Sequence, residues 1–165
     1  MNDIFNRPSV FIGKNTDPTD GFWLRLDSFE SIEQARAIIK ERFPDNNWIA
    51  ADSEYLPEFL IPEANCDIAQ LVDISKMWWE SEDDEEWTLF CLWADDTASE
   101  PTWANFRDSY RGGYDSPKEF AREMREGDVS QDMMMYVDWD WVWEDMRSEY
   151  ATYDQFGKTH IFAYI

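Results

Sequence analysis

The sequence predicts an α+β protein, because short β-prone runs near both ends of the chain enclose several helical patterns. Its 165 residues include 10 Trp, 11 Phe and 7 Tyr, which supply the apolar area that packed cores need. They also include 36 Asp and Glu against 14 Lys and Arg, a formal net charge of -22. Disordered acidic segments are poor in aromatic residues, so this chain is expected to fold.

The N-terminal part predicts a small sheet with one helix laid across it. Residues 9–13 and 21–26 are β-prone and are separated by turn residues, which favours a hairpin. A capping box precedes residues 32–43, where apolar residues recur at helical spacing. Residues 48–51 add a third strand, and the prolines that follow indicate a boundary near residue 62.

The middle segment, residues 63–103, is expected to be helical and carries the densest charge, with 12 acids and 1 base. Helices are predicted over 68–79, 84–94 and 103–110. On a helical wheel, one side of the second helix gathers the apolar residues Trp87, Phe90, Cys91 and Ala94.

The C-terminal part predicts two helices and a closing hairpin. After Gly112 and Gly113, which read as a break, a helix is expected over 117–125 and another over 138–149. The core face of the second helix gathers Trp139, Trp143, Met146 and Tyr150. Its acids lie on a different face, with Trp141 near them and exposed. Residues 150–156 and 159–164 form the predicted hairpin.

Catalytic patterns are largely missing, so the sequence predicts a protein that is not an enzyme and that uses no metal and no cofactor. His160 is the only histidine, and a structural role is expected for it. Cys66 and Cys91 have no metal-site spacing, which favours a reducing compartment. No acid stands two residues before a lysine, unlike the pattern typical of restriction-type nucleases.

The charge also predicts the kind of partner. The segments 1–62, 63–103 and 104–165 carry net charges of -5, -11 and -6, so the acids are distributed along the chain. Such a molecule repels nucleic acids and anionic membranes, and its partners should be cationic. The N-terminus, Met1 to Arg7, shows no signal peptide, and no run of 18 apolar residues occurs, so a cytoplasmic protein is expected.

Several motifs resemble the ArdA family of antirestriction proteins. The opening residues 10–13 and 21–26 resemble the family's first hairpin, and Asp52, Glu54, Leu56 and Pro57 resemble the end of its first domain. The longest match is followed by Tyr136, Val137, Asp138 and Trp139, and consists of Phe106, Asp108, Tyr110, Gly112, Tyr114, Asp115, Ser116, Phe120 and Ala121. Together the matches span nearly the whole chain in the family's order.

The resemblance implies a protein of a mobile genetic element with three small domains in a row, 1–62, 63–103 and 104–165, forming an elongated homodimer. It also implies a DNA mimic that occupies the DNA-binding groove of type I restriction-modification enzymes and binds no nucleic acid or membrane. The middle segment matches the family in length and acidity but not in motif. An inhibitor of another DNA-binding defence complex, of the anti-CRISPR type, therefore stays open, as do an acidic adaptor for a basic protein and an acidic surface without a partner.

The DNA-mimic hypothesis assigns roles to particular residues. Trp141 is the candidate for the dimer interface, because aromatic anchors favour such surfaces. The acids predicted to replace DNA phosphates in the partner's groove are Glu82, Asp83, Asp84, Glu85, Glu86, Asp95, Asp96, Asp138, Asp145 and Glu149.

Overall fold

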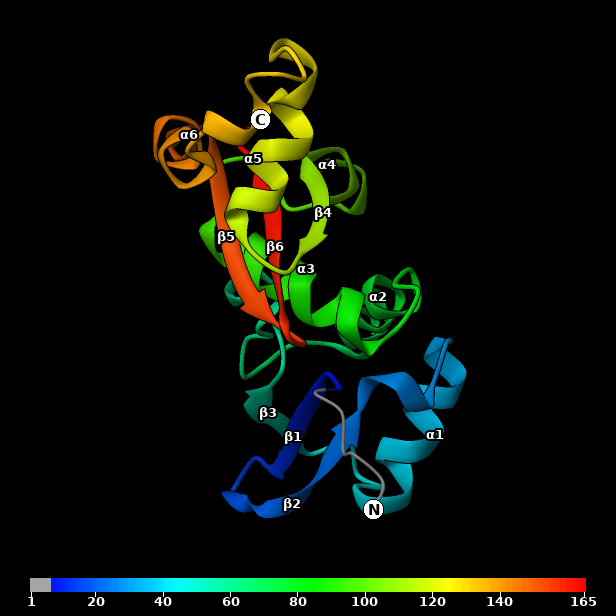
Figure 1. Cartoon of the computed structure of the whole chain (residues 1–165). Coiled ribbons are helices and arrows are strands. Elements are labelled where there is room, and N and C mark those ends of the chain that lie inside the picture. Colours follow the sequence, from blue (N-terminus) through cyan, green and yellow to red (C-terminus); the bar gives the residue numbers. More distant parts are fainter. Residues whose placement is uncertain (1–6) are drawn as a thin grey trace. The chain divides into compact units, whose positions relative to one another are not determined.

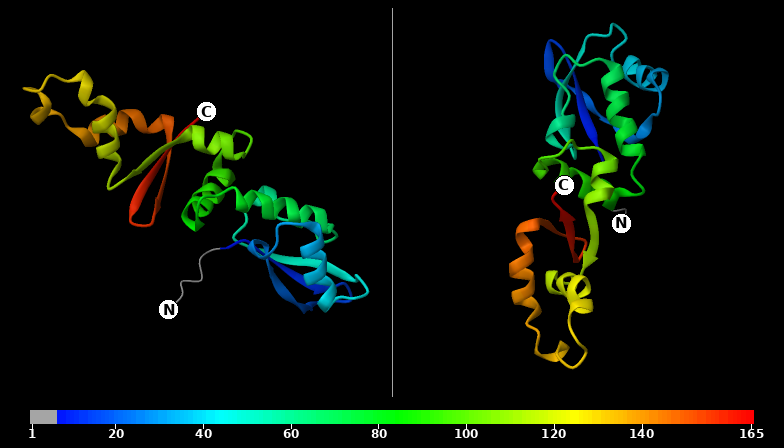
Figure 2. Two further views of the ribbon diagram at one scale, coloured as in Figure 1. Left: turned by 90° about the vertical axis from the view of Figure 1, so that its right-hand side faces the viewer. Right: turned by 90° about the horizontal axis from the view of Figure 1, so that it is seen from above.

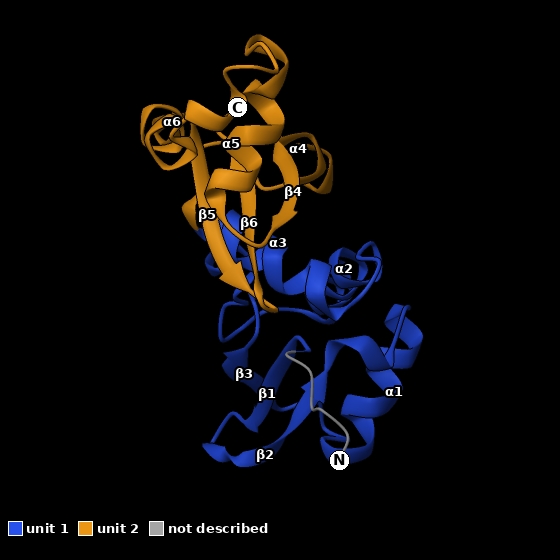
Figure 3. Ribbon diagram, in the orientation of Figure 1, with its two compact units in different colours: residues 1–95 blue, residues 96–165 orange. Residues whose placement is uncertain are grey.

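The structure is a computed structural model that describes residues 7–165, so the part of the N-terminal prediction that rests on residues 1–6 lies outside the described residues. It is a mixed α+β fold, as predicted, with helices and two small antiparallel sheets (Figure 1). The chain separates into two compact units, Met1–Asp95 and Asp96–Ile165 (Figure 3). The predicted division into three domains is not confirmed by this separation.

The first unit contains a three-stranded antiparallel sheet in the order β2-β1-β3. The central strand β1 (Ser9–Lys14) pairs with β2 (Asp17–Arg25) as the predicted hairpin, and with β3 (Trp48–Glu54) as the predicted third strand. Val10 and Ile12 alternate along β1 and are fully buried, so one face of the sheet belongs to the core.

Two helices complete this core. Helix α1 (Ile32–Arg42) begins at the predicted cap and contributes buried Ala35 and Ile39. Helix α2 (Ile68–Trp79) contributes three buried residues to the same core, although the sequence assigns it to the middle segment. The buried Ser75 hydroxyl lies 2.7 Å from both the Leu26 and the Phe29 carbonyl oxygens, which ties α2 to the end of the hairpin. The strands and both helices can be followed in Figure 2.

Helix α3 (Asp84–Asp96) is anchored by one face. Trp87 and Phe90 are fully buried as predicted, whereas the neighbouring Cys91 and Ala94 are half-buried. The Trp87 indole N–H donates to the Tyr55 carbonyl oxygen at 3.1 Å. This hydrogen bond fixes the helix to the segment that follows β3.

The second unit contains another three-stranded antiparallel sheet, in the order β4-β6-β5. The outer strands are joined through the central β6, which pairs with both. The elements in chain order are α4 (Trp103–Ser109), β4 (Tyr110–Tyr114), α5 (Pro117–Arg125), α6 (Trp139–Met146), β5 (Tyr150–Gln155) and β6 (Lys158–Ala163).

The core of this unit lies between its helices and its sheet. Buried Phe120 and Ala121 on α5 pack with Met146 on α6 and Ile161 on β6. The half-buried rings of Trp143 and Tyr150 pack against this cluster, as predicted for the inner face of α6. Trp139, also predicted for that face, is half-buried and is not part of this packing, whereas Val142 is.

Candidate functional site

The ten predicted acids fall at the ends of two helices. Residues 82–86 lie before and in the first turn of α3, and Asp95 and Asp96 end it. Asp138 precedes α6, Asp145 lies in its last turn, and Glu149 lies in the 3-10 turn that follows. All ten are exposed except Asp84 and Glu86, which are half-buried.

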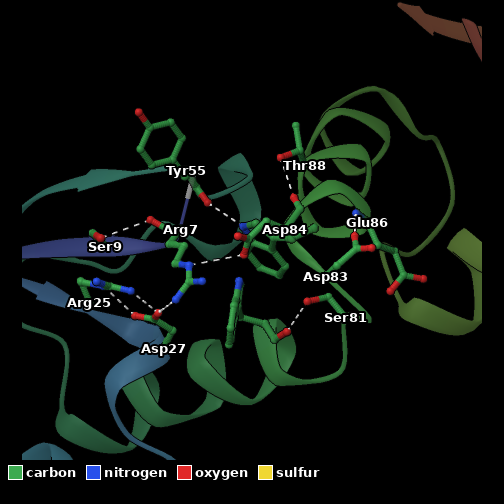
Figure 4. A network of polar contacts seen from close by, with 12 residues as sticks. Arg7, Ser9, Arg25, Asp27, Tyr55, Ser81, Asp83, Asp84, Glu86 and Thr88 are labelled. Carbon is green, nitrogen blue, oxygen red and sulfur yellow. Dashed lines mark hydrogen bonds and ion pairs between the residues drawn. The ribbon is translucent and has the colours of Figure 1, made fainter. Parts of the chain in front are cut away.

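Three of the five acids at the start of α3 make hydrogen bonds or an ion pair within the protein (Figure 4). The Asp83 carboxylate accepts the Glu86 N–H at 2.8 Å, and the Glu86 carboxylate accepts the Glu82 N–H at 2.6 Å. These two bonds satisfy N–H groups that the helix itself leaves without partners. The Asp84 carboxylate lies 3.5 Å from Arg7 Nε, with 18% of its side chain exposed. The carboxylates of Glu82 and Glu85 are exposed and make no hydrogen bond or ion pair with residues 7–165.

Arg7 also belongs to an ion network that fixes the start of the described chain. Its guanidinium donates to Asp27 Oδ2 at 2.6 Å, and Arg25 Nε donates to Asp27 Oδ1 at 2.9 Å. Burial disfavours the charged form of Asp27, whose side chain is only 6% exposed, but the hydrogen bonds from Arg25 and Arg7 outweigh that effect. The pKa of Asp27 therefore lies below its ordinary value.

Acids at the carboxyl ends of α3 and α6 oppose helix stability. The carboxyl end of a helix carries partial negative charge, which disfavours carboxylates and favours Lys and Arg. Helices α1, α2, α4 and α5 follow this rule with a base in the last turn. Helices α3 and α6 have no base in the last turn, which contains Asp95 and Asp96 in α3 and Asp145 in α6. In α6 the base Arg147 follows directly as the C-cap residue and pairs with Glu144 at 3.1 Å.

Two of these terminal acids have local donors that offset part of the cost. Asp95 Oδ1 accepts the Glu58 N–H at 2.7 Å, and Asp96 Oδ2 accepts the Tyr153 hydroxyl at 3.0 Å. Asp138, at the amino end of α6, is the cap and accepts the Trp141 N–H at 3.1 Å. The exposed carboxylates of Asp145 and Glu149 make no hydrogen bond or ion pair within the described chain.

Trp141 is exposed, as predicted, with 67% of its surface accessible. It is one of several large apolar residues that the second unit exposes on α5, on α6 and in the segment that joins them. The sequence analysis singled out only Trp141, although a run of three methionines just before α6 is a signal for such a surface. The others are Met124, Met133, Met135 and Tyr136.

The groups that could carry chemistry are placed as parts of the fold. His160 is 8% exposed, and its Nδ1 lies 2.9 Å from the Tyr110 hydroxyl. Burial raises the pKa of the Cys66 thiol to about 11 and also raises that of Cys91, which keeps both thiols protonated at neutral pH. No group of three or more potential metal ligands occurs within residues 7–165. No helix in this range has the length and apolar character needed to cross a membrane.

Comparisons with protein-family models, with curated proteins and with solved structures found no match for this chain. The resemblance to the ArdA family therefore stays a prediction from the motifs.

Proposed function

We propose that this protein is a non-catalytic DNA mimic that inhibits a DNA-binding defence enzyme by occupying its DNA channel, with a type I restriction-modification enzyme as the first candidate. The observation that carries the proposal is the set of acids at the carboxyl ends of α3 and α6. Folding alone disfavours carboxylates there. A role in binding a cationic partner accounts for them.

Charge spacing supports the same proposal. Side chains three or four residues apart on a helix lie about 5 to 6 Å apart, so acids on short helices can offer regularly spaced negative groups. B-form DNA carries one negative charge per roughly 1.7 Å of axis, and its binding proteins gain much of their affinity from those charges. The best candidates for phosphate surrogates are Glu82, Glu85, Asp145 and Glu149, because their carboxylates are exposed and make no hydrogen bond or ion pair within the described chain.

The finer features of the proposal rest on the motif resemblance. They are three domains in a row, a cytoplasmic homodimer that uses Trp141 at its interface, and an origin in a mobile genetic element. Light scattering of wild type and Trp141→Glu tests the dimer. A variant that remains dimeric removes that face from the proposal.

The main test is cleavage of unmodified DNA by a purified type I restriction enzyme, titrated with this protein at two salt concentrations. Inhibition should be stoichiometric and should weaken steeply as salt rises, because the interaction is between charges. Excess duplex DNA should compete with the protein. No inhibition at large molar excess, or inhibition indifferent to salt, would count against DNA mimicry.

Variants can separate the positions of the acids from the total charge. The test variant neutralises the four exposed, uncontacted carboxylates by Glu82→Gln, Glu85→Gln, Asp145→Asn and Glu149→Gln. The control neutralises four other exposed acids, so that both proteins carry the same net charge, by Glu33→Gln, Glu41→Gln, Asp45→Asn and Glu63→Gln. Only the first variant should lose inhibition. Equal losses would mean that net charge, not the placement of the acids, governs binding.

The other six acids of the predicted set, Asp84 and Glu86 among them, are excluded from this test because their carboxylates make hydrogen bonds or ion pairs within the described chain. Asp84 pairs with Arg7, and Glu86 satisfies the amino end of α3. Their reversal to lysine would disturb the fold, so a loss of inhibition could not be assigned to the partner's groove.

An acidic adaptor for a basic protein is the second candidate, favoured by the exposed methionines of the second unit. Met133 is 55% and Met135 81% exposed, and exposed methionines suit surfaces that accept varied partners. An adaptor should bind loose basic peptides about as well as a folded enzyme. A DNA mimic should prefer the folded enzyme, and duplex DNA should displace it.

A further inference from the structure

The first unit contains a pocket of about 740 Å³ beside helix α1 and the amino end of α2. This volume lies within the range of about 300 to 1,000 Å³ that is usual for small-molecule sites. Its lining combines polar and apolar side chains, among them Asn15, Arg36, Lys40, Phe43, Asn46 and Trp48. The proposed DNA mimicry uses none of them.

The cations of this pocket are unusual in so acidic a chain. Arg36 and Lys40 lie four residues apart on α1, a spacing that places side chains on the same helix face. Arg42 on the same helix pairs with Asp20 at 3.1 Å. Arg36 and Lys40 form no ion pair with any residue of 7–165, although the protein has 36 acids. Both side chains are exposed and free to meet an external anion.

The one acid in the lining has another role. Asp67 caps α2, and its carboxylate accepts the Gln70 N–H at 2.9 Å. The positive end of the helix favours its negative charge there. The carboxylate therefore does not neutralise Arg36 and Lys40 through an ion pair.

An aromatic side chain gives the pocket an apolar part. The Trp48 indole N–H donates to Asn46 Oδ1 at 3.0 Å, which holds the half-buried ring. Phe43, only 8% exposed, contributes a second ring to the lining. Aromatic faces favour contact with flat ligands at offset or edge geometry.

We propose that this pocket binds a small organic anion with a planar ring, whose carboxylate or phosphate pairs with Arg36 and Lys40 and whose ring lies against Trp48. The pairing uses charge-assisted hydrogen bonds, which are stronger than neutral ones. The site is separate from the acids assigned to the defence enzyme, so either proposal can fail without the other.

The test follows the Trp48 indole N–H by two-dimensional ¹H–¹⁵N NMR of the full-length labelled protein, with the signal assigned by Trp48→Phe. Adenosine monophosphate and benzoate are the anionic probes, and adenosine and benzamide are their neutral counterparts. A saturable shift is expected at millimolar concentration with at least one anion, and a much weaker one with its neutral counterpart. The anion that binds better identifies phosphate or carboxylate as the preferred group.

Paired variants test the role of the cations. Arg36→Ala with Lys40→Ala should weaken binding at least about tenfold, because both charged donors are lost. Lys118→Ala with Arg147→Ala changes the net charge equally at exposed sites in the other unit and should leave binding unchanged. The proposal would be overturned if neither anion produced a saturable shift. So would equal shifts with the neutral probes, or equal weakening by both variants.

Discussion

Helix α6 allows a direct test of whether its terminal acids oppose folding, because it has an aspartate at each end. Asp138 caps the amino end, and Asp145 lies in the last turn at the carboxyl end. Replacing either aspartate by asparagine removes one negative charge, so both variants have the same net charge. Asparagine is about as good a cap as aspartate, so the bond from the Trp141 N–H should be kept in Asp138→Asn. What differs between the variants is the helix end at which the charge is removed.

The expected effects have opposite signs. A charge near a helix end contributes about 0.3 to 1 kcal/mol, favourable for an acid at the amino end and unfavourable at the carboxyl end. Asp145→Asn should therefore raise the free energy of unfolding by about 0.3 to 1 kcal/mol, and Asp138→Asn should lower it by a similar amount. The free energies of unfolding of the two variants should therefore differ by about 0.6 to 2 kcal/mol. The effect of net charge is the same in both variants and cancels in this difference.

Urea denaturation followed by circular dichroism, at low and at high salt, measures this difference. Salt screens exposed charges, so the difference should shrink at high salt. If both variants stabilised the protein equally, general repulsion among the acids would outweigh the effect of the helix ends. The argument that the terminal acids oppose folding would then be refuted.

Three further predictions concern the fold. Because the pKa of Asp27 is lowered in the native state, its charged form stabilises the protein above the ordinary Asp pKa of about 3.9, and this contribution is lost as pH falls through the lowered value. The stability difference between wild type and Asp27→Asn should shrink in acid urea titrations, and a pH-independent difference would contradict this. The half-buried Cys66 thiol, with its pKa raised to about 11, should be alkylated by iodoacetamide at pH 8 more slowly in the native than in the urea-unfolded protein, and equal rates would mean that its surroundings do not suppress its reactivity. Gly112→Ala should lower the free energy of unfolding by about 1 to 3 kcal/mol, because φ is 120° there. Gly127→Ala should be near neutral in the same denaturation assay, because the added Cβ meets no side chain within 4 Å apart from those of adjacent residues.

Local signals predicted most of the elements. The capping box at Ser31 located the start of α1, and the wheel of α3 placed Trp87 and Phe90 in the core. Strand β4 was missed, because its central pair Gly112 and Gly113 reads as a break. Its strand structure depends on pairing with β6, about 50 residues later in the chain, which no local pattern can reveal.

The sequence was less informative about which elements share a core and which acids are free. The three buried apolar residues of α2 pack in the first unit because of long-range contacts, such as the bonds from the buried Ser75 to Leu26 and Phe29. The run 82–86 predicted five equivalent carboxylates. The structure separates them, since three serve the amino end of α3 or Arg7, and only Glu82 and Glu85 make no such contact.

The start of α3 can be compared with the start of α1, which makes the same two bonds with neutral side chains. The Ser31 hydroxyl accepts the Gln34 N–H at 3.3 Å, and Gln34 Oε1 accepts the Glu30 N–H at 2.8 Å. The motif therefore requires an oxygen acceptor but no charge. Sequence drift or design could exchange Asp83 for Ser and Glu86 for Gln and keep the helix start. The electrostatic field of this helix can thus be altered independently of its geometry.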